Sequence, residues 1–141
     1  MLRATPIADQ PDVSGGTVLV DIERTLVSLA RDLGMDTVTE IIDLYVVDSQ
    51  RHVANIRAGL AKNDAHVVRV AAHTLKSTAA TVGALPLAET CQEIERLARE
   101  SWIGEAGKLV DQLTRQETEA RVAVIGLQPK FAGLASADTR Y

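Results

Sequence analysis

Apolar side chains recur every three or four residues along most of this chain, the spacing that places them on one side of an α-helix. The longest such run lies between Thr37 and Asn63. Its inward stripe consists of Val38, Ile42, Tyr45, Ser49, Val53, Ile56 and Leu60. No stretch of useful length alternates between apolar and polar residues, as a half-buried strand would. Because aromatic residues are few, we expect aliphatic side chains and alanine to fill a core between helices, which predicts an all-α fold.

Helix start and stop signals divide the periodic region into five segments. These signals are Gly34, a Thr37–Glu40 capping box, Asn63 or Asp64, Gly83, Pro86, and the pair Gly126 and Pro129. They predict helices that begin at about residues 21, 38, 64, 86 and 103, the last one ending near Val124.

The two ends of the chain lack this periodicity. Residues 1–16 are interrupted by proline, glycine and serine and are expected to form a flexible arm, and residues 127–141 a loose tail. The domain is therefore expected to span residues 17–126. Four long amphipathic helices with short loops predict an antiparallel up-and-down four-helix bundle, with the first helix as an accessory.

His73 lies on the outer face of the third predicted helix. With about 100° per residue, the apolar stripe of this helix faces roughly 140° away from His73. That stripe consists of Val68, Ala72, Leu75, Ala79 and Val82. The residues that fall within about 60° of His73 on the same wheel are Arg69, Lys76, Ser77, Ala80 and Ala84. We therefore expect an exposed imidazole with two cations and small side chains around it.

These surroundings suit a histidine that accepts a phosphoryl group. A neutral imidazole is a nucleophile near pH 7. The cations favour the charge of about −1.5 to −2 that a phosphate brings. Small side chains let the backbone of a partner approach. The competing interpretation is an ordinary solvated histidine on a helix surface.

The residues around His73 resemble the signature of the histidine phosphotransfer (HPt) family. The matching residues are His73, Thr74, Leu75 and Lys76, then Gly83 and Ala84, then Leu87, Cys91, Ile94 and Glu95. The resemblance is dense from Arg69 to Arg99 and more diffuse from about Asp21 to Val124. One departure is Ser77, where the family often has glycine. The resemblance implies a four-helix bundle whose histidine carries phosphate at Nε2.

Neighbours of the histidine have expected roles, from their position and charge for Lys76, Arg69 and Gln92 and from the resemblance for Glu95. Lys76 is expected to stabilise the phosphate and Arg69 to add positive charge. Glu95 lies at the edge of its helix and, as an acceptor of the Nδ1 proton, would orient the imidazole. The alternative is an edge glutamate that is paired with a lysine or hydrated. Gln92 is a candidate donor to the phosphate. The expected partner-binding surface consists of Arg69, Val70, Ser77, Ala80 and Ala84, with parts of the second helix.

Several other functions are disfavoured. The net charge is −4 and the 15 lysines and arginines are scattered, which argues against nucleic-acid binding. Cys91 is the only cysteine and is expected in the core, so no disulfide within the chain and no zinc site with His52 and His66 is expected. No apolar run is long enough for a secretory signal or a membrane span. We expect a cytoplasmic protein that is a monomer.

Phosphoryl transfer would need help from outside this chain. No Gly-rich phosphate loop and no cluster of aspartates for Mg²⁺ is present. We therefore expect a passive carrier rather than an enzyme, with no cofactor of its own. By the family resemblance, its partners are response-regulator receiver domains, which hold the Mg²⁺, or a hybrid histidine kinase.

Three functional hypotheses remain open at this point. The first is a stand-alone carrier in a multistep phosphorelay, which Met1 and the short flanks favour, although a segment of a hybrid kinase would look the same. The second is a degenerate bundle that binds receivers or other regulators without carrying phosphate. The third is the phosphoacceptor part of a chemotaxis-type kinase, which the missing catalytic region disfavours.

Overall fold

The protein is all-helical over the residues that the structure, a computed structural model, describes. These are residues 11–138, with side chains described for residues 16–133. The six helices are α1 (Pro11–Leu33), α2 (Met35–Ala61), α3 (Ala65–Val82), α4 (Leu85–Arg99), α5 (Ile103–Gly107) and α6 (Val110–Asp138). The prediction of an all-α fold is confirmed. No described helix is both long enough and apolar enough to cross a membrane.

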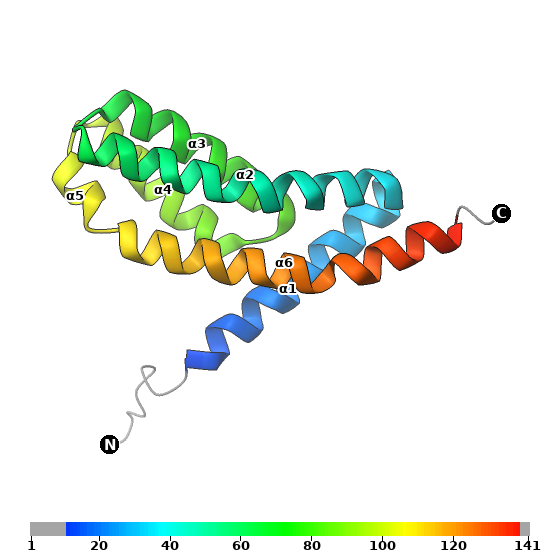
Figure 1. The fold of residues 1–141 in the computed structure, drawn as a ribbon. Coiled ribbons are helices and arrows are strands. Elements are labelled where there is room, and N and C mark those ends of the chain that lie inside the picture. Colours follow the sequence, from blue (N-terminus) through cyan, green and yellow to red (C-terminus); the bar gives the residue numbers. More distant parts are fainter. Residues whose placement is uncertain (1–10, 139–141) are drawn as a thin grey trace, which may run out of the picture.

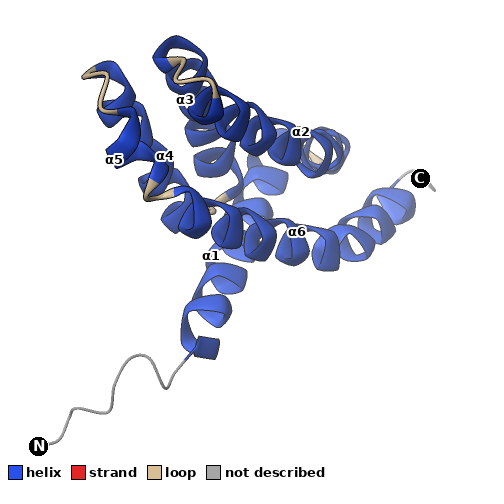
Figure 2. Ribbon diagram, turned by 60° about the vertical axis from the view of Figure 1, so that its left-hand side comes forward, coloured by secondary structure: helices blue, strands red, loops and turns tan. Residues whose placement is uncertain are grey.

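Four of these helices form an antiparallel bundle (Figure 1). Helix α3 packs against α2 on one side and against α4 on the other, and α6 completes the bundle mainly through α2. Helix α5 is a short link between α4 and α6. Helix α1 crosses the end of the bundle and packs mainly on α6 and α2, as an accessory helix. The start of α1 and the end of α6 extend away from the bundle in different directions (Figure 2).

The core contains the predicted stripes. Its largest fully buried side chains are Phe131, Ile22, Leu26, Ile42, Ile56, Leu75, Leu87, Ile94, Leu113, Val38, Val68 and Val82. Burying one such side chain contributes about 1.5–3 kcal/mol relative to leaving it in water. The core therefore fixes which face each helix turns outward. In α3 it fixes which side chains reach the surface.

The ends of α3 follow the predicted signals. Asp64 is the N-cap, and its side chain accepts a hydrogen bond from the backbone N–H of Val67 at 3.2 Å. Gly83 ends the helix in the left-handed conformation with φ 87°. Pro86 lies in the first turn of α4, where its missing N–H has no partner to lose.

The predicted capping box at Thr37–Glu40 is wrong. Helix α2 begins earlier, at Met35, because Gly34 ends α1 and starts α2 at once. The N–H of Gly34 donates to the Ala30 carbonyl of α1 at 2.9 Å, and the carbonyl of Gly34 accepts from the N–H of Val38 at 3.3 Å. Thr37 therefore lies inside the first turn of α2 rather than before it.

The expected arm and tail both need correction. Helix α1 begins at Pro11, so residues 11–16 are helical, and residues 1–10 lie outside the described part. Helix α6 continues through residues 127–138, because Leu127 and Phe131 are buried in the core, and residues 139–141 lie outside the described part. Two polar contacts support this extension: Gln128 bonds Asp43 of α2 at 3.3 Å, and Lys130 bonds Glu23 of α1 at 2.7 Å. Packing across helices overrides the helix-breaking tendency of Pro129.

Candidate phosphotransfer site

His73 lies in the middle of α3 with its ring directed outward. Its side chain is 60% exposed, whereas Ala72 and Leu75 beside it in sequence are fully buried. The expected burial of the opposite stripe is thus observed. Burial of that stripe between α2 and α4 fixes the rotation of α3, which leaves the imidazole at the surface.

One ring nitrogen of His73 is bound to a buried carboxylate. Nδ1 of His73 lies 2.9 Å from Oε2 of Glu95, which comes from the neighbouring helix α4. The Glu95 side chain is only 6% exposed, and His73 lies above it. The other ring nitrogen, Nε2, has no hydrogen-bond partner among the described residues. The geometry therefore leaves Nε2 available to a reactant.

Two cations share the same carboxylate. Nζ of Lys76 lies 2.7 Å from Oε1 of Glu95, and a guanidinium nitrogen of Arg99 lies 3.1 Å from Oε2. Burial by itself raises the pKa of Glu95, but the hydrogen bonds from Lys76 and His73 outweigh it, and the pKa is lowered. Glu95 is therefore ionised near neutral pH and acts as an acceptor only.

The ionised state of Glu95 selects the tautomer of the histidine. A carboxylate can only accept a hydrogen bond, so Nδ1 of His73 must carry the proton. In the neutral ring, Nε2 then holds the free lone pair. The arrangement is that of a histidine oriented by an acid, with the nucleophilic nitrogen turned to solvent.

Arg99 was not singled out from the sequence. It lies one turn after Glu95 on α4, at the i,i+4 spacing at which an acid and a base commonly pair. That spacing was the available signal, but it does not show that the pair would lie beneath a histidine of another helix. Together, His73, Lys76, Glu95 and Arg99 form the site cluster.

The remaining candidates lie around this cluster at different depths. Arg69 is half-buried, and its guanidinium lies 3.4 Å from Nδ1 of His66 rather than at His73. Gln92 is exposed one turn before Glu95 and makes no hydrogen bond within the described part of the chain. Val70, Ser77 and Ala80 are exposed on the same side of α3 as His73, as expected.

Ala84 was expected on the partner-binding surface, and the structure contradicts this. Ala84 is only 1% exposed and belongs to the core. The helical wheel was extended to Ala84, beyond the predicted helix end at Gly83, and the helix does end there, at Val82. The left-handed turn at Gly83 redirects the chain, so Ala84 faces inward at the start of α4.

The other chemically reactive side chains lie outside the site cluster. Cys91 is fully buried. Burial, with the Glu95 carboxylate nearby, raises the pKa of its thiol to about 12 and makes it a poor nucleophile. His52 is partly buried on α2 and His66 is exposed at the start of α3. Among the described residues, no three metal-binding side chains come together.

Comparison with known proteins agrees with this geometry. The family model described as "Hpt domain" matches residues 40–123, more than half of the chain. The chain belongs to the Hpt-domain family. It is also similar to a solved structure, that of histidine-containing phosphotransfer protein B (HptB) from Pseudomonas aeruginosa PAO1. The two are 29% identical with a TM-score of 0.71, over 76% of this chain and 92% of that one.

A search of curated proteins gave no match. The family match and the structural match confirm the predicted family and the helical-bundle fold. They support a histidine-phosphotransfer role in phosphorelays, which is the role of a phosphocarrier rather than of an enzyme.

Proposed function

We propose that this protein carries a phosphoryl group on Nε2 of His73, which it accepts from the phospho-aspartate of one receiver domain and passes to another. The observation that carries this proposal is the bond between Nδ1 of His73 and the buried carboxylate of Glu95, with Nε2 at the surface. Neither feature alone would suffice, since exposed histidines and edge glutamates are common.

The transfer step forms one bond and breaks one. The Nε2 lone pair attacks the phosphorus of the phospho-aspartate, the P–N bond forms, and the P–O bond to the aspartate breaks, so that a carboxylate leaves. The imidazole ring gains positive charge as the P–N bond forms. Glu95 stabilises that charge through the Nδ1–H bond, in a partly buried setting where hydrogen bonds to charged groups are strong. Reversal of the same step delivers the phosphate to the next receiver.

Lys76 has two tasks in this proposal, and Arg99 shares the first of them. In the free protein they neutralise Glu95, the least exposed charge of the cluster. When a phosphoryl group adds about −1.5 to −2 charges at Nε2, Lys76 is free to turn from Glu95 to the phosphate oxygens. The Lys76 side chain is 31% exposed, so this movement needs no repacking of the core.

The chain is proposed to act as a monomeric carrier with no nucleotide or metal of its own. The receiver domain supplies the phosphoryl group, Mg²⁺ and most of the catalysis. It is proposed to dock on the outer face of α3 around Val70, Ser77 and Ala80, with Arg69 at the edge. Such a contact would be small and transient, at the low end of interface sizes.

The test is phosphoryl transfer from purified, phosphorylated receiver domains. We expect label on the wild-type chain that is labile in acid and stable in alkali, and no label on a His73→Gln variant. His66→Gln is the matched control, because His66 is exposed on the same side of α3. Label that survives in His73→Gln contradicts the assigned residue. Receiver binding without any label supports a degenerate bundle that only binds. Labelling by ATP and a partner kinase, without a receiver, supports the chemotaxis-type alternative.

A further inference from the structure

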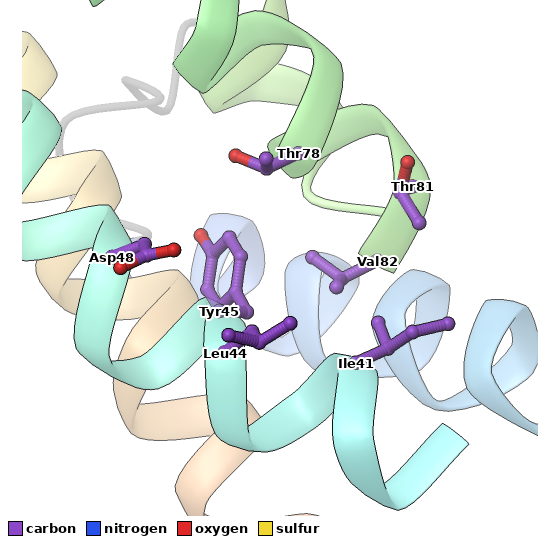
Figure 3. Close-up of a pocket in the computed structure, with 7 residues that line it drawn as sticks. All are labelled: Ile41, Leu44, Tyr45, Asp48, Thr78, Thr81 and Val82. Carbon is purple, nitrogen blue, oxygen red and sulfur yellow. The ribbon is translucent and has the colours of Figure 1, made fainter. Parts of the chain in front are cut away.

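A cleft between α2 and α3 lies beside the proposed docking face. Its volume is about 220 Å³, and it is lined by Ile41, Leu44, Tyr45, Asp48, Thr78, Thr81 and Val82 (Figure 3). Thr78 follows His73 by five residues on the same helix, which is a rise of about 7.5 Å along the axis. Five residues also turn the helix by about 140°, which places Thr78 toward α2, so a protein covers both the histidine and this cleft only if it docks across α3 onto α2.

The cleft contains a buried hydroxyl without a partner. Tyr45 is only 3% exposed, yet its hydroxyl makes no hydrogen bond to any described residue. Figure 3 shows the ring standing in the cleft, with the hydroxyl at the side of Asp48 and Thr78. Burial, with the Glu117 carboxylate nearby, raises the pKa of Tyr45, so the hydroxyl stays protonated and can donate. A buried donor without an acceptor is costly, so a side chain that brings an acceptor to this hydroxyl would gain affinity from the contact.

The other polar groups of the cleft can only accept. The hydroxyls of Thr78 and Thr81 donate to the carbonyls of Leu75 and Ser77 in their own helix, at 3.2 and 3.0 Å. Asp48 accepts one bond from Arg51 at 2.6 Å and has a second oxygen. The cleft thus offers one donor and several acceptors between apolar walls.

This inventory restricts the side chain that fits. An apolar tip would leave the Tyr45 hydroxyl unpaired. An ammonium would also leave that hydroxyl unpaired, because an ammonium only donates hydrogen bonds. A carboxylate would be repelled by Asp48. A hydroxyl or a primary amide can accept from Tyr45 and donate to Asp48 or Thr78 at once. The volume is below the roughly 300–1,000 Å³ of typical small-molecule sites, which favours a single inserted side chain.

We infer that the α2/α3 cleft is a specificity pocket, which takes one receiver side chain with an apolar stem and a hydroxyl or primary-amide tip. The inference rests on the proposed function, because it takes the receiver to be the molecule that docks at His73. Leu44 at the cleft is 63% exposed and Val70 of the docking face is 46% exposed, so both offer apolar surface to the same partner. Receivers without a matching side chain would dock more weakly, which gives selectivity among them.

The test measures binding of a panel of purified receiver domains by calorimetry, separately from transfer of phosphate. Tyr45→Phe removes only the hydroxyl. We expect a dissociation constant about three- to tenfold weaker, as for the loss of one neutral hydrogen bond, with melting temperature unchanged or higher. Thr81→Met narrows the cleft from its exposed edge, and we expect about thirtyfold weaker binding, as for the loss of a central anchor residue. Thr118→Met on α6 is the matched control and should bind normally.

The outcomes separate the two proposals. If receivers bind and label His73 but both cleft variants bind normally, the pocket inference is overturned while the carrier function stands. If no receiver labels His73 but binding still depends on Tyr45 and Thr81, the carrier function fails and the pocket stands. If no receiver of the panel binds, the pocket inference is overturned. If Thr81→Met instead abolishes a dimer seen by sedimentation, the cleft holds a second copy of the chain, which also overturns it.

Discussion

His73 and Glu95 belong to neighbouring helices and are bonded to each other, with 2.9 Å between Nδ1 and Oε2. The exposed partner is the imidazole and the buried partner is the acid. It matters that the acid is the buried partner, because packing then holds its orientation while the exposed ring can contact another protein. The predictions about the site follow from this pair.

The first prediction concerns Glu95→Gln. The amide oxygen can still accept the Nδ1–H bond, but it carries no charge to balance the ring during transfer. We expect phosphorylation of His73 to slow about fivefold, since hydrogen bonds to charged groups exceed neutral ones by roughly 1 kcal/mol. Rapid-quench measurement of transfer from a phosphorylated receiver checks this. An unchanged rate would show that the carboxylate only packs beneath the ring.

The second prediction concerns Arg99. Arg99→Ala removes one of the two cations at Glu95, so the phosphoryl group meets a less positive site, and we expect transfer about two- to fivefold slower. Arg96→Ala is the matched control, because Arg96 lies on the same helix and pairs with Glu93, away from the site. The same quench assay compares them. Equal rates for the two variants would remove Arg99 from the site.

The third prediction concerns acid. The folded-state pKa of Glu95 is lowered, so its contribution to stability is present above its unfolded pKa of about 4.3 and is lost as pH falls through the lower folded value. We expect the loss of unfolding free energy between pH 5 and pH 3 to be smaller in Glu95→Gln than in the wild type. Urea unfolding at several pH values measures it. Glu89→Gln is the control, because Glu89 is exposed on the same helix and makes no ion pair with a described residue, and it should follow the wild type.

The fourth prediction concerns the turn between α3 and α4. Gly83 has φ 87°, and a Cβ at this position would overlap Thr25 of α1. We expect Gly83→Ala to destabilise the protein by about 1–3 kcal/mol through backbone strain, with the displacement of α1 adding to it. Thermal unfolding measures this. Gly126→Ala is the control, because nothing lies within 4 Å of a Cβ there and the helical position should favour alanine.

The fifth prediction tests the corrected end of the domain. Phe131 is 1% exposed although it lies in the expected tail. We expect Phe131→Ala to lower the unfolding free energy by about 3–5 kcal/mol, as for other buried aromatic residues. Chemical denaturation measures it. A loss below about 0.5 kcal/mol, typical of a surface position, would instead support the loose tail that the sequence predicted.

Most features that depend on a single helix were predicted from the sequence, the Thr37–Glu40 capping box excepted, whereas of the contacts between helices only that of Glu95 with His73 was expected, and only from the family resemblance. The outward position of His73 follows from the stripe on its own helix, and the Asp64 and Gly83 caps are local signals. The meeting of Arg99 with the site needs the packing of α4 on α3. The inward turn of Ala84 follows a change of direction that a wheel cannot represent. Phe131 is helical because of contacts with distant segments, which local Pro and Gly signals did not reveal.

His73 and Glu95 belong to separate helices, so the orientation of the imidazole depends on how α3 and α4 pack against each other. A small slide of α4 along α3 would move the carboxylate from Nδ1 while leaving both helices intact. Reactivity toward phosphate should then disappear before helical content does on gradual warming. Under the proposed function, the chain would accept phosphate only while α3 and α4 are correctly packed, and a partly unfolded copy would not.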